Sequence, residues 1–284
     1  MNVQTQMRLP LAGPLRAGSF LVTLFGDVVA PRGGEVGIRE VIAFCAPFGL
    51  SETLIRTAMS RLVAAGQVQG LRQGRRSYYA LTDQARAEYM QAAEVIYGSP
   101  TATRWRFLFF PQGGAAQHLA AMSDPGFVPL SEQFALGPAR GDVSEQAIAF
   151  TAEADVVPEA LREMVAQLWS LEALASEYQN FSALARQIDR LEAPEPGHAL
   201  ALRVLLVHAY REIALRDPRL PTATLPADWP GHAARKDFAA LYLRLSPAAD
   251  SAAARQFASA TGALPQATPA TRARRSMLQR IVSE

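Results

Sequence analysis

Cysteine is almost absent from this chain of 284 residues, and histidine is scarce. Cys45 is the sole cysteine, so no disulfide can form within the chain. It lies in the apolar run VIAFCAPF, which predicts a small core residue in a reducing compartment. The four histidines show no ligand spacing with one another or with Cys45. We therefore expect neither a disulfide framework nor a metal site, and no resident cofactor.

Long apolar runs are also lacking. None approaches the roughly 18 residues that a membrane-spanning helix needs, and the N-terminal residues lack the basic-then-apolar pattern of a secretory signal. At 284 residues the chain exceeds one typical domain, so we expect two or three units with separate cores. These features predict a cytoplasmic globular protein with no membrane partner.

Charge is distributed by segment, although the net value is only +2. Residues 1–97 carry ten basic and seven acidic side chains, and residues 196–284 carry twelve and six. Residues 142–195 carry three basic and eleven acidic side chains. A polyanion would therefore be attracted to the two ends of the chain and repelled by the acidic middle.

The first hundred residues show a succession of short elements. Apolar spacing predicts helices over 19–29 and 38–46, and a third helix follows the turn PFGL with Ser51 as its N-cap and Gly66 as its stop. Ser19 is the expected N-cap of the first helix. The segments QVQGLRQ and RSYYALT predict two strands joined by a turn. This order is typical of a winged helix-turn-helix.

The third helix has one apolar and one polar side. Leu54, Ala58 and Leu62 form an apolar line, which Ile55, Met59 and Val63 widen. Short hydroxyl side chains and arginines occupy the other side, a pattern suited to base edges and phosphates in the major groove. Any surface helix has a polar side, so the prediction of DNA binding depends on the helix together with the basic hairpin that follows it. The candidate DNA-binding residues are Ser51, Thr53, Arg56, Thr57, Ser60, Arg61, Arg72, Arg75, Arg76 and Tyr78.

The rest of the chain divides into an α+β stretch and a helical stretch. After the linker GSPTAT, the segments RWRFLFF, FVPLSEQFAL and QAIAFTAE predict strands, with a helix near 115–122 between the first two. From residue 158 onward the apolar spacing is helical, interrupted by proline-rich loops.

Several segments resemble the PaaX-type transcriptional repressors, the negative regulators of phenylacetic acid degradation operons. They are LVTLFGDVVAPRGGEV, APFGLSETLIRTAMSRLVAAGQV, RQGRRSYYALT, RWRFLFF, LWSLEALASEYQNF and LLVHAYREIALRDPRLPTATLPADWPG, in the same order along nearly the whole chain. The resemblance implies an α+β multidomain protein with a winged helix-turn-helix domain (15–97), a ferredoxin-like, Cas2-like domain (104–175) and a helical domain (176–284). Residues 1–14 mix Gly, Pro and polar residues without periodicity, which predicts a flexible N-terminus. The resemblance implies no nuclease activity, because RWRFLFF lacks a metal-binding carboxylate.

The resemblance also implies a mechanism and partners. Family members are homodimers that bind an operator in double-stranded DNA and release it when an aryl-acetyl coenzyme A thioester, typically phenylacetyl-CoA, binds. Such a ligand needs basic side chains for its phosphates and aromatic surroundings for its aryl group. The C-terminal segment offers both chemistries, and its candidate effector residues are His208, Arg211, Arg216, Arg219 and Trp229. Each also has an ordinary structural interpretation, as a helix-end cap, an ion-pair partner or a core anchor.

Two other functional classes stay open. An enzyme acting on a CoA thioester or aryl acid could use the C-terminal His/Arg cluster with His208 as base, but no nucleophile motif or paired-carboxylate cluster supports it. A scaffold protein could use the winged helix to bind another protein. Binding that depends on salt and on DNA sequence would distinguish a regulator from such a scaffold.

Overall fold

A computed structural model describes residues 14–98, 104–122, 126–140, 143, 145–153, 159–191 and 195–283. Apart from residue 14, the N-terminal stretch predicted to be flexible lies outside these residues, as do residues 99–103 of the predicted linker. The chain forms two compact units, each assembled from separate segments. Unit 1 comprises Met1–Gly98, Asn180–Glu212 and Ala234–Glu284, and unit 2 comprises Ser99–Gln179 and Ile213–Ala233.

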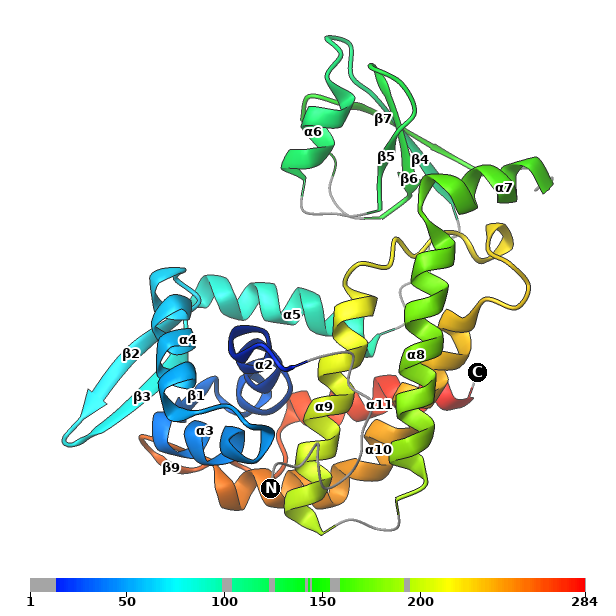
Figure 1. Cartoon of the computed structure of the whole chain (residues 1–284). Helices are drawn as coiled ribbons and strands as arrows, with labels where there is room; N and C mark the ends of the chain where they lie inside the picture. The colour runs from blue at the N-terminus through cyan, green and yellow to red at the C-terminus, as the bar shows by residue number, and fades with distance from the viewer. Residues whose placement is uncertain are drawn as a thin grey trace. The chain divides into compact units, whose positions relative to one another are not determined.

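The N-terminal part of unit 1 alternates short helices with a small sheet (Figure 1). Its elements are α2 (Ala17–Leu24), the π-helix η1 (Phe25–Val29), the 3-10 helix η2 (Ala30–Arg32), β1 (Glu35–Gly37), α3 (Ile38–Cys45), the 3-10 helix η3 (Ala46–Phe48), α4 (Glu52–Ala64), β2 (Val68–Gln73), β3 (Arg76–Leu81) and α5 (Asp83–Tyr97). The strands pair in the order β1-β3-β2, all antiparallel. The predicted succession of helices and hairpin is confirmed, and β1 is a strand that the sequence analysis missed.

Local sequence signals set several of these boundaries. Ser51 and Thr82 precede α4 and α5, and each side-chain oxygen accepts a hydrogen bond from the backbone N–H three residues later, at 3.3 and 3.2 Å. Gly66 follows α4 with a φ of 69°, a left-handed conformation that glycine adopts without strain. The predicted cap at Ser19 is wrong, because α2 already begins at Ala17.

The C-terminal part of unit 1 is mainly helical. It contains the second half of α8 (Leu171–Asp189), most of α9 (Pro196–Ala214) and α10 (Pro230–Gln256), and α11 (Pro269–Ser283). A short hairpin that was not predicted lies between α10 and α11 and is formed by β8 (Ala258–Ser259) and β9 (Gly262–Ala263). This hairpin contacts β1, and the Ala260 N–H donates to Glu35 Oε1 at 2.6 Å. The C-terminal helices thus share one unit with the N-terminal elements.

Unit 2 contains an antiparallel four-stranded sheet. Its elements are β4 (Trp105–Phe109), α6 (Ala115–Ala121), β5 (Val128–Pro129), β6 (Phe134–Pro138) and β7 (Ile148–Ala152), and the strand order is β5-β6-β4-β7. Since β6 is antiparallel to both neighbours, β4 and β5 run parallel with β6 between them. One face of the sheet lies against α6, where the core residues are Leu108, Phe110, Ala115, Phe127 and Ala135.

The remaining elements of unit 2 are α7 (Glu159–Leu168), the first half of α8 and the 3-10 helix η4 (Thr222–Thr224). Between α7 and α8, the indole of Trp169 lies 5.7 Å from that of Trp105 and donates to the carbonyl of Gly126 at 3.0 Å. The protein is therefore of mixed α and β structure with helices toward its C-terminus, as predicted. Among the helices that the structure describes, none is long and apolar enough to cross a membrane.

Candidate nucleic-acid interface

Helix α4 is fixed in unit 1 by one apolar face. Ile55, Ala58, Met59 and Leu62 are buried on this face, and α2 packs against the helix. Burial of these side chains stabilises the helix by roughly 1.5–3 kcal/mol for each large one. The opposite face is therefore held toward solvent in a defined orientation.

The exposed face of α4 carries the polar side chains that the sequence predicted there: Thr53, Arg56, Thr57, Ser60 and Arg61. Ser60 donates its hydroxyl hydrogen to the carbonyl of Arg56 at 3.0 Å, and Arg56 Nε donates to Glu52 Oε1 at 2.7 Å. Both members of this ion pair are more than half exposed, so it contributes little to stability. Arg56 can therefore exchange this partner for another acceptor at small cost.

Two residues of the predicted apolar side are not buried. Leu54 is 51% exposed and Val63 is 41% exposed, because they lie at the borders of the buried face rather than at its centre. The apolar contact of α4 is accordingly narrower than the periodicity suggested.

The β2–β3 hairpin extends away from the helices of unit 1 (Figure 1). Gln73 pairs with Arg76, so Gly74 and Arg75 form a two-residue turn, and the φ of 59° at Gly74 explains the glycine there. Arg72 Nε donates to the Gly74 carbonyl at 3.4 Å. All three arginines near the tip are exposed.

Tyr78 is the exception among the candidate DNA-binding residues. Its side chain is only 5% exposed, so it belongs to the core beneath the hairpin and not to the outer surface. The remaining candidates place five arginines on α4 and the hairpin: Arg56, Arg61, Arg72, Arg75 and Arg76. A surface with this excess of positive charge attracts a polyanion.

The five predicted effector residues are divided between the units, with His208 and Arg211 in unit 1. His208 Nδ1 lies 2.9 Å from Thr23 Oγ1, and Arg211 donates to Thr23 Oγ1 at 2.7 Å and to Ser19 Oγ at 2.8 Å. Burial, with the nearby charge of Arg211, lowers the pKa of His208 to about 4, although Glu212 acts in the opposite direction. The two residues thus join α9 to α2, which in turn packs against α4.

The other three predicted effector residues lie in unit 2. Arg216 forms an ion pair with Glu177, and Arg219 donates to the Ala214 carbonyl at 3.2 Å. Trp229 is buried edge-on against Tyr178, whose hydroxyl donates to Asp217 at 2.6 Å. Each residue therefore has a structural role of its own.

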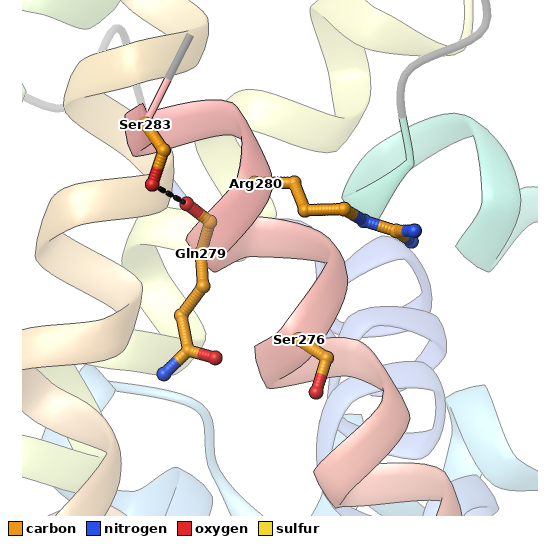
Figure 2. A pocket seen from close by; sticks show the side chains of 4 residues that line it. All are labelled: Ser276, Gln279, Arg280 and Ser283. Carbon is orange, nitrogen blue, oxygen red and sulfur yellow. Dashed lines mark hydrogen bonds between the residues drawn. The ribbon is translucent and has the colours of Figure 1, made fainter.

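A surface pocket of about 440 Å³ lies along α11, and Figure 2 shows side chains of this helix that line it: Ser276, Gln279, Arg280 and Ser283. Ser283 donates its hydroxyl hydrogen to the Gln279 carbonyl at 3.0 Å. The lining residues that the structure describes do not include a predicted effector residue. Within the part of the chain that the structure describes, no cluster of His, Cys, Asp or Glu could hold a metal ion.

A buried ionic network in unit 1 escaped the sequence analysis. Asp27 accepts hydrogen bonds from Arg203, Arg274, Tyr97 and Tyr242 at 2.8–3.2 Å. Burial alone would raise the pKa of Asp27, but Arg203 and Arg274 hold it below its usual value. Charged residues inside the apolar segments FGDVV and LALRVLLV were the available signal, because a buried charge requires a partner.

A second carboxylate extends the same network. Asp250 binds Arg203 and Arg32, each at 2.6 Å, and also Arg275. Asp27 itself belongs to the π-helix η1, whose carbonyls at Gly26 and Asp27 accept hydrogen bonds from Arg274. The network therefore fastens α9, α10 and α11 to η1 and η2, which follow directly after α2.

Residues 16–85 match the family model described as PaaX-like protein, and residues 169–255 match the model of the PaaX-like protein C-terminal domain. The "Transcriptional repressor PaaX" of Escherichia coli (strain K12) is 30% identical over 89% of this chain and 88% of the relative.

A solved structure, "Uncharacterized protein Rv0674 from Mycobacterium tuberculosis", is similar with a TM-score of 0.48 and 23% identity, over 75% of this chain and 89% of that chain. The curated relative is named a transcriptional repressor, in agreement with the prediction that this chain is a regulator and not an enzyme. The two matched models and the identity along most of the sequence establish that the chain belongs to the PaaX-like protein family.

Proposed function

We propose that the chain is a cytoplasmic, DNA-binding transcriptional repressor. The observation that carries the proposal is the exposed face of α4 with its hydroxyls and arginines, followed directly by the basic β2–β3 hairpin. The relative named above is a transcriptional repressor, which supports the same function. In this proposal α4 enters the major groove, and Arg72, Arg75 and Arg76 bind the phosphate backbone.

We assign the DNA-binding part, residues 15–97, to the winged helix-turn-helix class. Three helices (α2, α3 and α4) precede a hairpin, and β1 completes the small sheet in the order β1-β3-β2. The connection from α3 to α4 is short, with η3 and Gly49 at a φ of 80° making the turn. In this class α4 is the recognition helix and the hairpin is the wing.

We assign residues 104–175 to the ferredoxin-like class. The split β4-α6-β5 arrangement with β6 between the two strands supports this assignment. A helix would be expected between β6 and β7, but residues 143 and 145–147 of that connection are not helical. The ferredoxin-like assignment therefore depends on strand order. We assign residues 176–284 to a helical C-terminal domain.

We propose that the repressor acts as a homodimer. An exposed apolar face on the four-stranded sheet supports this, because Phe134, Ile148 and Phe150 are exposed beside the half-buried Phe107 and Phe109. Apolar patches of this kind mark protein–protein contacts. A two-fold dimer requires a partly palindromic operator with half-sites about one helical turn, or a multiple of it, apart.

We further propose that an aryl-acetyl-CoA thioester, phenylacetyl-CoA in the first instance, releases the repressor from a phenylacetate-type catabolic operon. This follows from the family resemblance. His208 and Arg211 support it because their contacts with Thr23 and Ser19 lead to α2 and α4. Arg216, Arg219 and Trp229 are the candidates in unit 2. A ligand that rearranged the contacts of His208 or Arg211 would favour a form unable to bind DNA.

The experiment that tests the proposal is a fluorescence-anisotropy titration with the promoter beside the protein's own gene. It is made at two salt concentrations, with and without phenylacetyl-CoA, and with free phenylacetate as the matched control. The expected result is tight binding that prefers the promoter over random DNA, weakens with salt, and is lost only with the thioester. Binding unaffected by the thioester would retain the repressor and reject the effector. Absence of specific binding would reject the repressor and favour the scaffold alternative.

A further inference from the structure

Leu54 is an exposed large apolar side chain near the start of α4. It is the third residue of the helix, and its backbone N–H donates to Ser51 Oγ at 3.3 Å, so its backbone is held by the helix cap. Its side chain is nevertheless 51% exposed, although a leucine gains free energy when it leaves water. The fold leaves half of this side chain available for contact.

The neighbours of Leu54 are those expected of a groove-facing surface. Residues three and seven positions later, Thr57 and Arg61, lie on the same side of the helix and are exposed. Recognition helices place their N-terminal residues against base edges, and Leu54 lies in that part of α4. Leu54 is thus an apolar side chain among polar groups suited to DNA.

We propose that Leu54 contacts the C5-methyl group of a thymine in the major groove and so specifies an A·T pair in each half-site of the operator. Thymine is the base that presents a methyl group at the major-groove edge, and apolar side chains recognise it there. The inference rests on the proposed DNA-binding function and adds a specificity-determining residue that the polar pattern does not supply.

Val63 provides a matched control. It is also apolar, 41% exposed and on α4, but it lies at the C-terminal end of the helix, away from the residues that would meet base edges. Truncation of either exposed side chain should change the stability of the fold little. Leu54→Ala and Val63→Ala therefore differ mainly in their position relative to the groove.

The experiment uses an operator selected from random duplex DNA by repeated binding to the full-length chain. Each thymine is then replaced singly by deoxyuridine, which removes only the methyl group, and dissociation constants are measured by fluorescence anisotropy. In each half-site one replacement should weaken the wild-type protein about fourfold, the factor that corresponds to burial of one methyl group. Leu54→Ala should not distinguish thymine from uracil at that position, whereas Val63→Ala should distinguish them as the wild type does.

The possible outcomes distinguish failure of the Leu54–thymine contact from failure of the proposed DNA-binding function. If Leu54→Ala keeps the wild-type discrimination, or if no thymine replacement affects the wild type, the contact does not exist while the DNA-binding function stands. If selection yields no preferred sequence, both the specific DNA-binding function and the contact are rejected. Loss of discrimination in Leu54→Ala alone establishes the contact.

Discussion

Arg203 Nε and Asp27 Oδ2 form a fully buried ion pair at 3.0 Å, although the two residues are 176 positions apart in the sequence. Arg203 also binds Asp250 on α10, and Arg274 from α11 binds Asp27. A buried charge pair of this kind is costly to break, because the remaining partner keeps its charge without compensation. The pair therefore holds the C-terminal helices in a fixed relation to η1 and α2.

The first prediction concerns the stability of this network. Asp27→Asn leaves Arg203 and Arg274 without their shared negative charge and should lower the free energy of unfolding by about 3–5 kcal/mol. Urea unfolding followed by circular dichroism measures the change. Glu88→Gln, on the exposed side of α5, should change it by less than about 0.5 kcal/mol. Equal effects of the two substitutions would show that the buried ion pairs of Asp27 contribute no more to the free energy of unfolding than an exposed carboxylate does.

The second prediction separates base contact from phosphate contact. Arg56→Ala should cost roughly 1–3 kcal/mol on the selected operator and relax its base preference, because an arginine on the exposed face of α4 can bind guanine with two bonds. Arg75→Ala, at the hairpin tip, should weaken specific and random DNA about equally and reduce the salt dependence by about one charge. Anisotropy titrations against both DNAs measure these effects. If Arg56→Ala lost the same affinity for both DNAs, Arg56 would not contact a base, and another side chain would have to read the groove.

The third prediction concerns the oligomeric state. Phe150 on β7 is exposed on the apolar face of the four-stranded sheet, and its position pairs with Phe107 of β4. Phe150→Glu introduces a charge that a buried interface cannot solvate, so it should shift a dimer toward the monomer by at least about tenfold in dissociation constant. Sedimentation velocity over a concentration series measures this shift. Gln84→Glu, an exposed position on α5, should leave the dimer unchanged. A Phe150→Glu dimer as stable as the wild type would place the interface elsewhere.

Local signals predicted the fold near α4 well. Capping by Ser51, the stop at Gly66 and the hairpin pattern depend on neighbouring residues, and each is seen in the structure. Periodicity alone was less exact at the borders of faces, where Leu54 proved exposed and Tyr78 proved buried.

Contacts between distant segments could not be predicted in the same way. The Asp27–Arg203 pair joins α9 to a π-helical segment whose carbonyls accept hydrogen bonds from Arg274 of α11. No local spacing indicates which of the chain's arginines reaches a given carboxylate. The chemistry of His208 and Arg211 makes them candidates from sequence alone, but their partners Thr23 and Ser19 lie on a distant segment, α2, which only the tertiary structure brings next to α9.

The fourth prediction concerns Cys45. Its side chain is fully buried in α3, and burial raises the pKa of the thiol to about 12, so almost no reactive thiolate is present at neutral pH. Native protein should react with a disulfide reagent at least about a hundredfold more slowly than protein unfolded in urea. The absorbance of the released thiol reports the rate. Rapid reaction of the native protein would mean that α3 opens readily.

The fifth prediction concerns pH and His208. Burial lowers the pKa of His208 to about 4 in the folded protein, from an ordinary value of 6.5. Between these two values the unfolded chain binds more protons at this site than the folded chain, so the free energy of unfolding should fall as the pH decreases from about 6.5 to about 4. The contribution of this one side chain amounts to roughly 3 kcal/mol.

His208→Gln keeps a polar group beside Thr23 and removes the titration, so its unfolding free energy should depend less on pH over this range. Urea unfolding of both proteins at several pH values between 4 and 7.5 measures the difference, since the other titrating groups are common to both. Glu212 lies 3.8 Å from His208 Nε2, so Glu212→Gln is measured in parallel. If the attraction of Glu212 outweighed burial, the pKa of His208 would be raised instead. The wild type would then lose stability relative to His208→Gln as the pH rises, which is the opposite of the expected result.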